Sequence, residues 1–508
     1  MALPGRQRTD GSRVVVVGAG IGGVSFAIAL KRQLGFQGFT IYEQATDIGG
    51  TWRDNTYPGS GCDTPAHWYS LSTDLNPYWS TTVPPQHEVW AYWKALATKY
   101  DLYEHTTFHT KVISAAWDTA QQNYCIVLED VKTGERRDTR ASVVISAQGY
   151  LVERRIPENL RDAGLERFAG PVFHSANWNH DIPLSGKRVV VIGNGASAAQ
   201  FIPRLIADQS TYVVNFCRTA NWFLPSIRGD YSTLQIWAFA NVPFVLRLYR
   251  NWLVLVNGLF PIMRRKWRAV FGGRAPEQHL IDYIQQTAPR KYHDQLVPRY
   301  PLGCRRPILD PGYLACLHQS NVELNWNGIS RITENEIHTD KGETIAADVI
   351  ILSTGFVTDQ YSVHITGSDG QTLSDYFAAN GGPTAYLGVG VPGFPNLFFV
   401  GGPNTVTSNG SAVFTHEIAI NQIVQLLRPV LSPSPSILSV APKRAAHDAY
   451  NKRLQETLSA TSWVRCASWY RAGADGNGKN FGIFPWSVWA FWWLTRRVDW
   501  ENWECLSV

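Results

Sequence analysis

Two glycine-rich loops constrain the fold of this chain more than any other feature. Residues 12–23 read SRVVVVGAGIGG, and residues 186–201 read GKRVVVIGNGASAAQF. In each segment a run of valine and isoleucine leads into glycines and then into an apolar helical pattern, which is typical of a buried parallel strand, a tight turn and a helix. The sequence therefore predicts an α/β fold that contains this strand–turn–helix unit twice.

The small residues of both loops have the spacing used to bind the phosphates of a dinucleotide. The tight turn, the approach of backbone to pyrophosphate and the packing of helix on strand each require a residue with little or no side chain. We therefore expect two Rossmann-like domains, with the phosphates at the helix N-termini. The loop residues expected to contact the dinucleotides are Gly18, Gly20 and Gly23 in the first loop and Gly193, Gly195, Ser197 and Ala198 in the second.

The two units carry opposite charges at the ends of their second strands. Glu43, in FTIYEQ, follows Gly18 by 25 residues, and Arg218, at the end of TYVVNFCR, follows Gly193 by 25 residues. A carboxylate accepts hydrogen bonds from a ribose 2′-hydroxyl, whereas a guanidinium suits a 2′-phosphate. The sequence thus predicts FAD or NAD in the first site and NADPH in the second. This pairing indicates an enzyme that passes electrons from NADPH to a flavin.

The composition argues against several other classes. The chain has 508 residues, of which 44% are hydrophobic and 17% charged, and its net charge is only +5, without a run of five basic residues. These values favour a globular protein and argue against a nucleic-acid partner. The HE pairs at 87–88 and 416–417 lack the second histidine of HExxH, so we expect no metal site.

The cysteines and the apolar runs indicate in which cellular compartment the protein works and whether it contacts a membrane. The seven cysteines are odd in number and include no CxxC pair, which indicates reduced thiols in an intracellular protein rather than a disulfide framework. No signal-peptide pattern precedes Val14, so we expect a cytoplasmic location. The run WLVLVNGLFPIM, at 252–263, is too short to span a bilayer. A peripheral membrane contact through this run or through VWAFWWL, at 488–494, stays open as an alternative.

Two further motifs carry a family resemblance. The segment FAGPVFHSANW fills the pattern FxGxxxHxxxW, and GGTWRDNTYPGSGCD fills GGxWxxxxYPGxxxD. On these motifs the chain resembles the type I Baeyer-Villiger monooxygenases, a branch of the flavin-containing monooxygenase superfamily. The similarity continues through four segments along the rest of the chain: YPLGCRRP (300–307), DVIILSTGF (348–356), GPNT (402–405) and SWYRAGADGNGK (468–479).

The resemblance implies roles for individual residues. Arg306 matches an arginine that stabilises negative charge during the reaction, and Asp63 matches the acid that positions this arginine. His174 matches a residue that organises movement between the domains and is not a general base; alternatively, His174 and Trp178 could stack on one helical face. The remaining cofactor-binding residues implied by the resemblance are Thr51, Trp52 and Tyr69 at the flavin, Arg218, Thr219 and Arg305 around the 2′-phosphate, and Trp469 at the nicotinamide ribose.

The resemblance also implies how the chain is divided. We expect a discontinuous FAD-binding domain over residues 1–160 and 375–508 and an NADP-binding domain over 161–222 and 299–374. Residues 223–298 are expected to form a helical insertion in the second domain. Their apolar and basic mixture suits a lid or tunnel over a bulky apolar substrate.

The expected reaction uses NADPH, FAD and O2 to insert one oxygen atom next to a ketone carbonyl, which gives an ester or lactone. A polyketide, terpenoid or steroid ketone suits the apolar insertion better than a small one. The enzymatic alternative is hydroxylation at nitrogen or sulfur, against which Trp178, Asp63 and Arg306 argue. A third alternative is a flavoprotein without activity that serves as a binding or sensing module, and intact Asp63 and Arg306 argue against this as well.

Overall fold

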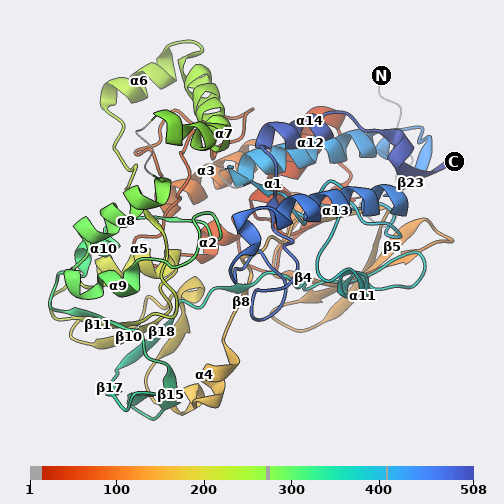
Figure 1. Ribbon diagram of the computed structural model, residues 1–508. Coiled ribbons are helices and arrows are strands. Elements are labelled where there is room, and N and C mark those ends of the chain that lie inside the picture. The colour runs from red at the N-terminus through yellow and green to blue at the C-terminus, as the bar shows by residue number, and fades with distance from the viewer. Residues whose placement is uncertain (1–13, 271–274, 408–409, 508) are drawn as a thin grey trace.

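Two parallel β-sheets organise the molecule (Figure 1). The computed structural model describes residues 14–270, 275–407 and 410–507, so small parts of the expected FAD-binding range and of the expected insertion lie outside the described residues. The first sheet has the order β21 (Leu397–Phe399), β7 (Val143–Ser146), β1 (Val14–Val17), β2 (Phe39–Tyr42) and β3 (Thr106–Thr107). The second has the order β14 (Val322–Asn325), β11 (Tyr212–Phe216), β10 (Arg188–Ile192), β18 (Val349–Leu352) and β9 (Val172–His174). The predicted α/β fold with two Rossmann-type units is confirmed.

The glycine loops join β1 and β10 to the helices that the sequence predicts. Helix α1 (Ile21–Ala29) follows β1, and α5 (Ala196–Leu205) follows β10. Gly18 and Gly193 have φ angles of +97° and +107°, in the region where a side chain is strained. A Cβ atom on Gly193 would lie 2.3 Å from the carbonyl oxygen of Ser353, on the neighbouring strand end. Both loops therefore need glycine for conformation as well as for close packing.

The C-terminal part of the chain returns to the first sheet. Strand β21 pairs with β7 in parallel, and α12 (Ala412–Leu431) packs against α1. Val14, Ile41, Val424 and Leu427 are all buried in one core. A four-stranded sheet lies beside it, in the order β20 (His364–Thr366), β4 (Thr110–Asp118), β5 (Asn123–Asp130) and β6 (Arg136–Ala141).

The remaining elements surround the two sheets. Helix α3 (Gln86–Lys99) packs on the first sheet's core, and α13 (Arg444–Ser459) and α14 (Val488–Thr495) lie toward the C-terminus. A small antiparallel sheet of β15 (Ile329–Ile332), β16 (Glu336–Thr339) and β17 (Thr344–Ala346) borders the second sheet. Short helices connect several of these elements and include α2 (Thr51–Asp54), α4 (Glu158–Asp162), α10 (Tyr313–Cys316) and α11 (Leu373–Ala379).

Helices dominate the segment between β11 and β14. They are α6 (Thr233–Asn241), α7 (Val245–Val270), α8 (Pro276–Thr287) and α9 (His293–Leu296). Figure 1 shows α8 and α9 near the second sheet, whereas α6 and α7 extend to the top of the molecule, toward α12. Arg250 of α7 forms an ion pair with Glu417 of α12, with an Nη2–Oε2 distance of 3.2 Å. Among the described residues, no helix is both long and apolar enough to cross a membrane.

Candidate active site

The first glycine loop faces the acid that the sequence singled out. Glu43 is buried, and its carboxylate accepts hydrogen bonds from the backbone N–H groups of Ala19, at 2.8 Å, and Ala45, at 2.9 Å. Arg53 of α2 lies 3.2 Å from the same carboxylate. Glu43 is therefore held against the loop, where the predicted ribose would lie. Its pairing with Arg53 was not predicted, because nothing in the spacing marks this arginine.

The residues predicted to contact the flavin lie together next to this loop. Thr51 and Trp52 begin α2 directly after Gly50. The indole N–H of Trp52 donates to the hydroxyl of Tyr69 at 3.0 Å, and the two rings pack edge to face. Burial raises the pKa of Tyr69 far above its ordinary value, so the phenol stays neutral.

Arg306 and Asp63 form an ion pair, although they lie 243 residues apart in the sequence. An Nη2 nitrogen of Arg306 donates to the Asp63 carboxylate at 2.8 Å and contacts the Thr64 hydroxyl at 3.4 Å. Both side chains are about two-fifths exposed, at 41% and 38%, so the pair faces open space rather than a sealed core. The negative charge of Asp63 raises the pKa of Arg306, which keeps the guanidinium charged.

Cys62 and Tyr470 lie next to the Arg306–Asp63 pair, and their place there was not predicted from the sequence. Burial raises the pKa of the Cys62 thiol and of the Tyr470 phenol to about 12 each. Both groups are therefore uncharged at neutral pH, and Arg306 carries the cation of this cluster. Tyr470 comes from the C-terminal motif, and its neighbour Trp469 lies over it with a ring separation of 3.9 Å and an exposed indole.

The second glycine loop lies beside the predicted cations. Asn194, in the loop, donates to the carbonyl of Thr219 at 2.9 Å, which fixes the turn that carries the exposed Arg218. Ser197, in the first turn of α5, faces the Tyr57 hydroxyl. Burial lowers the pKa of Arg305, and the positive charge of Arg218 lowers it further. Two arginines from distant segments thus converge on one place beside the loop.

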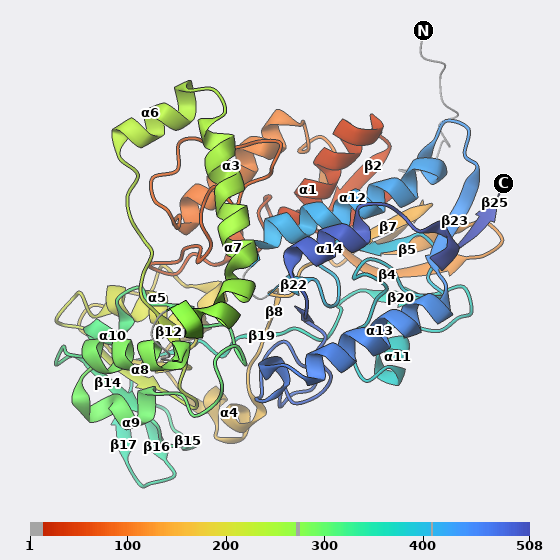
Figure 2. The same ribbon diagram turned by 45° about the horizontal axis from the view of Figure 1, so that its top comes forward.

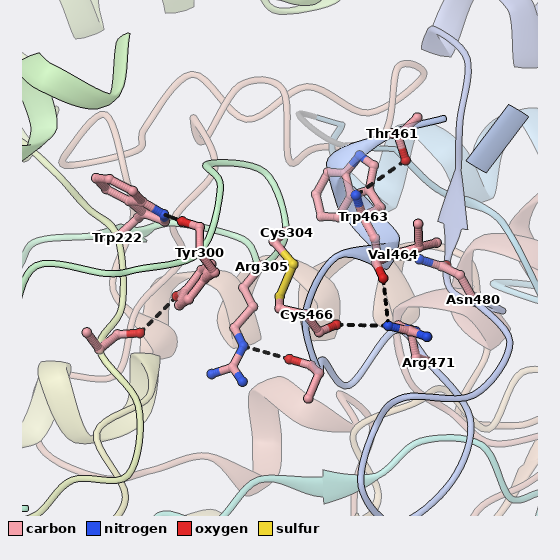
Figure 3. Close-up of a disulfide and its surroundings, with 12 residues drawn as sticks. Trp222, Tyr300, Cys304, Arg305, Thr461, Trp463, Val464, Cys466, Arg471 and Asn480 are labelled. Atoms are coloured by element: carbon pink, nitrogen blue, oxygen red, sulfur yellow. Dashed lines mark hydrogen bonds between the residues drawn. A yellow bond between two sulfur atoms is a disulfide. The ribbon is translucent and has the colours of Figure 1, made fainter. Parts of the chain in front are cut away.

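A disulfide joins Cys304 to Cys466, which corrects the prediction that the thiols are reduced throughout (Figure 3). The bond links the segment that carries Arg305 and Arg306 to the segment that carries Trp469. The guanidinium of Arg305 also donates to the carbonyl of Ala467 at 2.8 Å. An odd cysteine count without a CxxC pair gives no information about a single pair that lies 162 residues apart. The other five cysteines are free.

Both ring nitrogens of His174 form hydrogen bonds with backbone groups. Its Nε2 atom lies 3.1 Å from the carbonyl of Gly355, and its Nδ1 atom accepts from the N–H of Ala176 at 3.1 Å. Burial lowers its pKa to about 4, so the ring is neutral and has no free nitrogen for proton transfer. The alternative of stacking with Trp178 on one helix was wrong, because His174 ends strand β9 and its ring packs on Phe356 instead.

A cavity of about 930 Å³ lies between the two nucleotide-binding units. Its lining includes the segment from Thr56 to Asp63, Gln200 and Arg204 of α5, and the turn Asp310–Gly312, together with parts of the segments 83–87 and 226–230. Tyr57 and Gln200 close one wall through a hydrogen bond of 2.8 Å. Among the described residues, no group of three or more His, Cys, Asp or Glu side chains is placed to hold a metal ion.

Comparisons with known proteins find relatives over nearly the whole chain. A family described as "Flavin-binding monooxygenase-like" matches residues 11–236. A "Baeyer-Villiger monooxygenase" of Streptomyces coelicolor is 34% identical over 97% of this chain and 92% of its own. Among solved structures, "OTEMO complex with FAD and NADP" has a TM-score of 0.84 at 22% identity and covers 98% of this chain and all of its own. "Oxidized steroid monooxygenase bound to NADP" has a TM-score of 0.82 at 25% identity, with the same coverage.

Proposed function

Because the chain belongs to the Baeyer-Villiger monooxygenases, within the flavin-binding monooxygenase-like family, we propose that it oxidises a ketone to an ester or lactone with NADPH, FAD and O2. The observation that carries the proposal is the Arg306–Asp63 ion pair, which joins segments 243 residues apart and lies beside Tyr69. An oxygen insertion next to a carbonyl develops negative charge on oxygen, and a fixed cation stabilises that charge.

The residues of both loops fit the two cofactors. At the first loop, the backbones of Gly20 and Gly50 approach so closely that a Cβ atom on Gly50 would lie 3.0 Å from the Cα of Gly20. Such a space admits a pyrophosphate only without side chains. At the second loop, Arg218 and Arg305 pair with no carboxylate of the described residues, as suits a phosphate-binding site.

Arg306 is proposed to act as the anion-stabilising residue. FAD supplies the oxygen activation that side chains cannot perform, and NADPH supplies electrons. Only the Nη2 atom of Arg306 is used in hydrogen bonds to Asp63 and Thr64, which leaves other N–H groups to donate to a substrate oxygen as it becomes negative. Asp63 positions the guanidinium, and the neutral Cys62 and Tyr470 add no competing charge. His174 takes no part in proton transfer.

We predict that Arg306→Ala lowers kcat for ketone oxidation by a factor on the order of 10² to 10³, since this is the usual effect of removing a dedicated donor to a developing oxyanion. Ester or lactone formation is measured by mass spectrometry with labelled dioxygen. The control is Arg306→Lys, which keeps the charge without the planar fork and should retain part of the activity. Normal ketone oxidation by an Arg306→Ala protein with full flavin content would refute the assigned role.

The substrate is proposed to be a bulky apolar ketone. Support comes from the large apolar side chains that α6 and α7 carry and from a structural relative described as a steroid monooxygenase. A panel of polyketide, terpenoid, steroid and small cyclic ketones, with amines and sulfides alongside, separates this proposal from nitrogen or sulfur oxidation. Faster NADPH consumption with amines or sulfides than with any ketone would favour the alternative chemistry.

We also propose a division of the chain into an FAD-binding domain, an NADP-binding domain and an insertion. The FAD-binding domain would comprise residues 1–160 and 375–508, and the NADP-binding domain 161–222 and 299–374, with 223–298 inserted. The pairing of β21 with β7 supports the discontinuous first domain. Limited proteolysis, followed by mass spectrometry of the fragments, should cut preferentially near these boundaries.

A further inference from the structure

Three helices on one side of the molecule expose large apolar side chains to solvent. The most exposed are Phe244 (76%), Leu234 (73%), Leu248 (65%) and Trp493 (59%). We call this surface the aromatic face; its apolar members are Leu234 and Trp237 of α6, Phe244 at the α6–α7 turn, Leu248, Trp252, Leu255 and Val256 of α7, and Trp489, Trp492, Trp493 and Leu494 of α14. Exposed single apolar residues are ordinary, but a contiguous set of this size marks an interaction surface.

Helix α7 contacts both of the other helices, α6 and α14. Trp489 of α14 packs against Gly258 of α7, because a Cβ atom on that glycine would lie 2.4 Å from the indole nitrogen. Both views show α6, α7 and α14 on the side that is uppermost in Figure 1 and that comes forward in Figure 2. In α7, the exposed Leu248, Trp252 and Leu255 follow one another at steps of four and three residues, so they form a stripe. Phe244, just before the helix, precedes Leu248 by four residues and extends this stripe.

The opposite side of α7 is already used by the fold. Leu246, Leu253 and Val254 are buried, and Arg250 pairs with Glu417. Helix α7 therefore has one apolar side buried in the protein and a second apolar side exposed to solvent. Phe244 adds a second observation: its φ angle is +65°, a conformation that is rare for a bulky residue, and it presents the ring to solvent.

The charged residues of the segments that carry the aromatic face are all basic. The sequence holds no Asp or Glu from Tyr231 to Pro276 and none from Val488 to Val498. Arg247 and Arg497 are exposed, and the guanidinium of Arg496 lies 3.2 Å from the centre of the Trp493 ring. The acids that border these segments are Asp230, Glu277 and Asp499.

We propose that the aromatic face binds the surface of an anionic phospholipid bilayer. Tryptophan is favoured at the boundary between hydrocarbon and water, and arginine is attracted to anionic headgroups. A helix with an apolar, aromatic side and only basic charges lies in the plane of such a surface. The protein would then bind at the surface of the bilayer. This inference is independent of the proposed oxidation.

Vesicle flotation tests the proposal with the FAD-loaded enzyme. Phosphatidylcholine vesicles that contain phosphatidylserine should carry the protein upward, and vesicles of phosphatidylcholine alone should carry much less. Added salt should weaken the binding because the headgroup attraction is screened. Equal recovery with both vesicle types, or no recovery with either, overturns the proposal.

Two variants separate the apolar and the charged contributions. The triple variant Phe244→Ser, Leu248→Ser, Trp493→Ser should lower the partition coefficient by about tenfold or more, since each side chain loses its apolar contact. The double variant Arg247→Glu, Arg497→Glu should lower it by about tenfold or more on anionic vesicles alone.

The matched control is Val131→Ser. Val131 is 52% exposed and lies in the turn between β5 and β6, outside the aromatic face. It should bind like the parent protein, and all variants should keep their flavin content and melting temperature. If the triple variant binds vesicles as well as the control does, the proposal fails. It also fails if light scattering shows a dimer that the triple variant abolishes, because the face then binds a second copy.

Discussion

Two buried histidines differ in whether their ring nitrogens have hydrogen-bond partners, and this difference should affect stability. His67 and His174 are both inaccessible, and burial lowers the pKa of each to about 4. The His174 ring uses both nitrogens in hydrogen bonds to the backbone, whereas neither nitrogen of His67 has a partner. His67 is instead surrounded by the rings of Tyr231, Phe239 and Tyr249.

The same substitution should therefore have opposite effects at the two positions. His67→Phe should raise the free energy of unfolding by about 1 kcal/mol, because it removes an unpaired polar group from an aromatic cluster. His174→Phe should lower it by about 1–3 kcal/mol, because the N–H of Ala176 loses its acceptor. Urea denaturation at pH 8 measures both. A gain at position 174 or a large loss at position 67 would contradict this account.

The lowered pKa values also predict acid sensitivity. Below the ordinary histidine pKa of 6.5 the unfolded chain takes up protons that the folded protein excludes, so stability falls as the pH drops from 6.5 toward 4. His67→Phe should make the free energy of unfolding fall less steeply between pH 6.5 and pH 4. Above pH 7 it should add no pH dependence. Denaturation series at several pH values test this directly.

Arg218 should decide between nicotinamide donors. Arg218→Glu replaces a cation beside the second loop with an anion, so the KM for NADPH should rise by about 10- to 100-fold or more while the KM for NADH changes little or falls. Steady-state NADPH and NADH oxidation measures the ratio. The control is Arg331→Glu, on the exposed strand β15, which should leave both KM values unchanged. An unaltered preference in Arg218→Glu would remove the assignment of this site.

At the scale of elements, an ion pair at the buried side of α7 helps to hold this helix against α12. Glu417 accepts from the N–H and hydroxyl of Ser72 as well as from Arg250, and burial raises its pKa. Arg250→Met should cost about 3 kcal/mol, because it leaves a buried carboxylate without its cation. Hydrogen exchange should accelerate in α7 and α12 more than in the second sheet. Uniform acceleration throughout the protein would instead indicate global destabilisation.

The strand–turn–helix units were predictable because their signals are local. Gly18, Gly193, Glu43 and Arg218 stand at fixed spacings within one short stretch each. Both glycines have positive φ angles and Glu43 lies against the first loop, whereas binding of a 2′-phosphate by Arg218 stays a prediction. The Arg306–Asp63 pair followed from family motifs, and no spacing in the sequence could give it. The Arg53–Glu43 pair, the rings around His67 and the place of Tyr470 join distant segments, which a local pattern does not reveal.

Across the whole molecule, the Cys304–Cys466 disulfide ties the segment with Arg305 and Arg306 to that with Trp469. The double variant Cys304→Ser, Cys466→Ser should lower the free energy of unfolding by about 2–5 kcal/mol, because a long loop in the unfolded chain is no longer closed. It should also raise the KM for NADPH, since the two segments are no longer linked. Mass spectrometry of the unreduced protein should find this pair and five free thiols. The control Cys505→Ser removes an exposed free thiol and should change neither quantity.

The order of strands in the two sheets has a consequence for synthesis on the ribosome. The second sheet needs only residues 172–352, whereas the first begins at Val14 and lacks its edge strand until Leu397–Phe399 has been made. The second sheet can thus fold while the first sheet is still incomplete. Until β21 has been made, the edge of β7 in the first sheet has no partner strand. Nascent chains halted before residue 397 should consequently recruit chaperones through their earliest-made part.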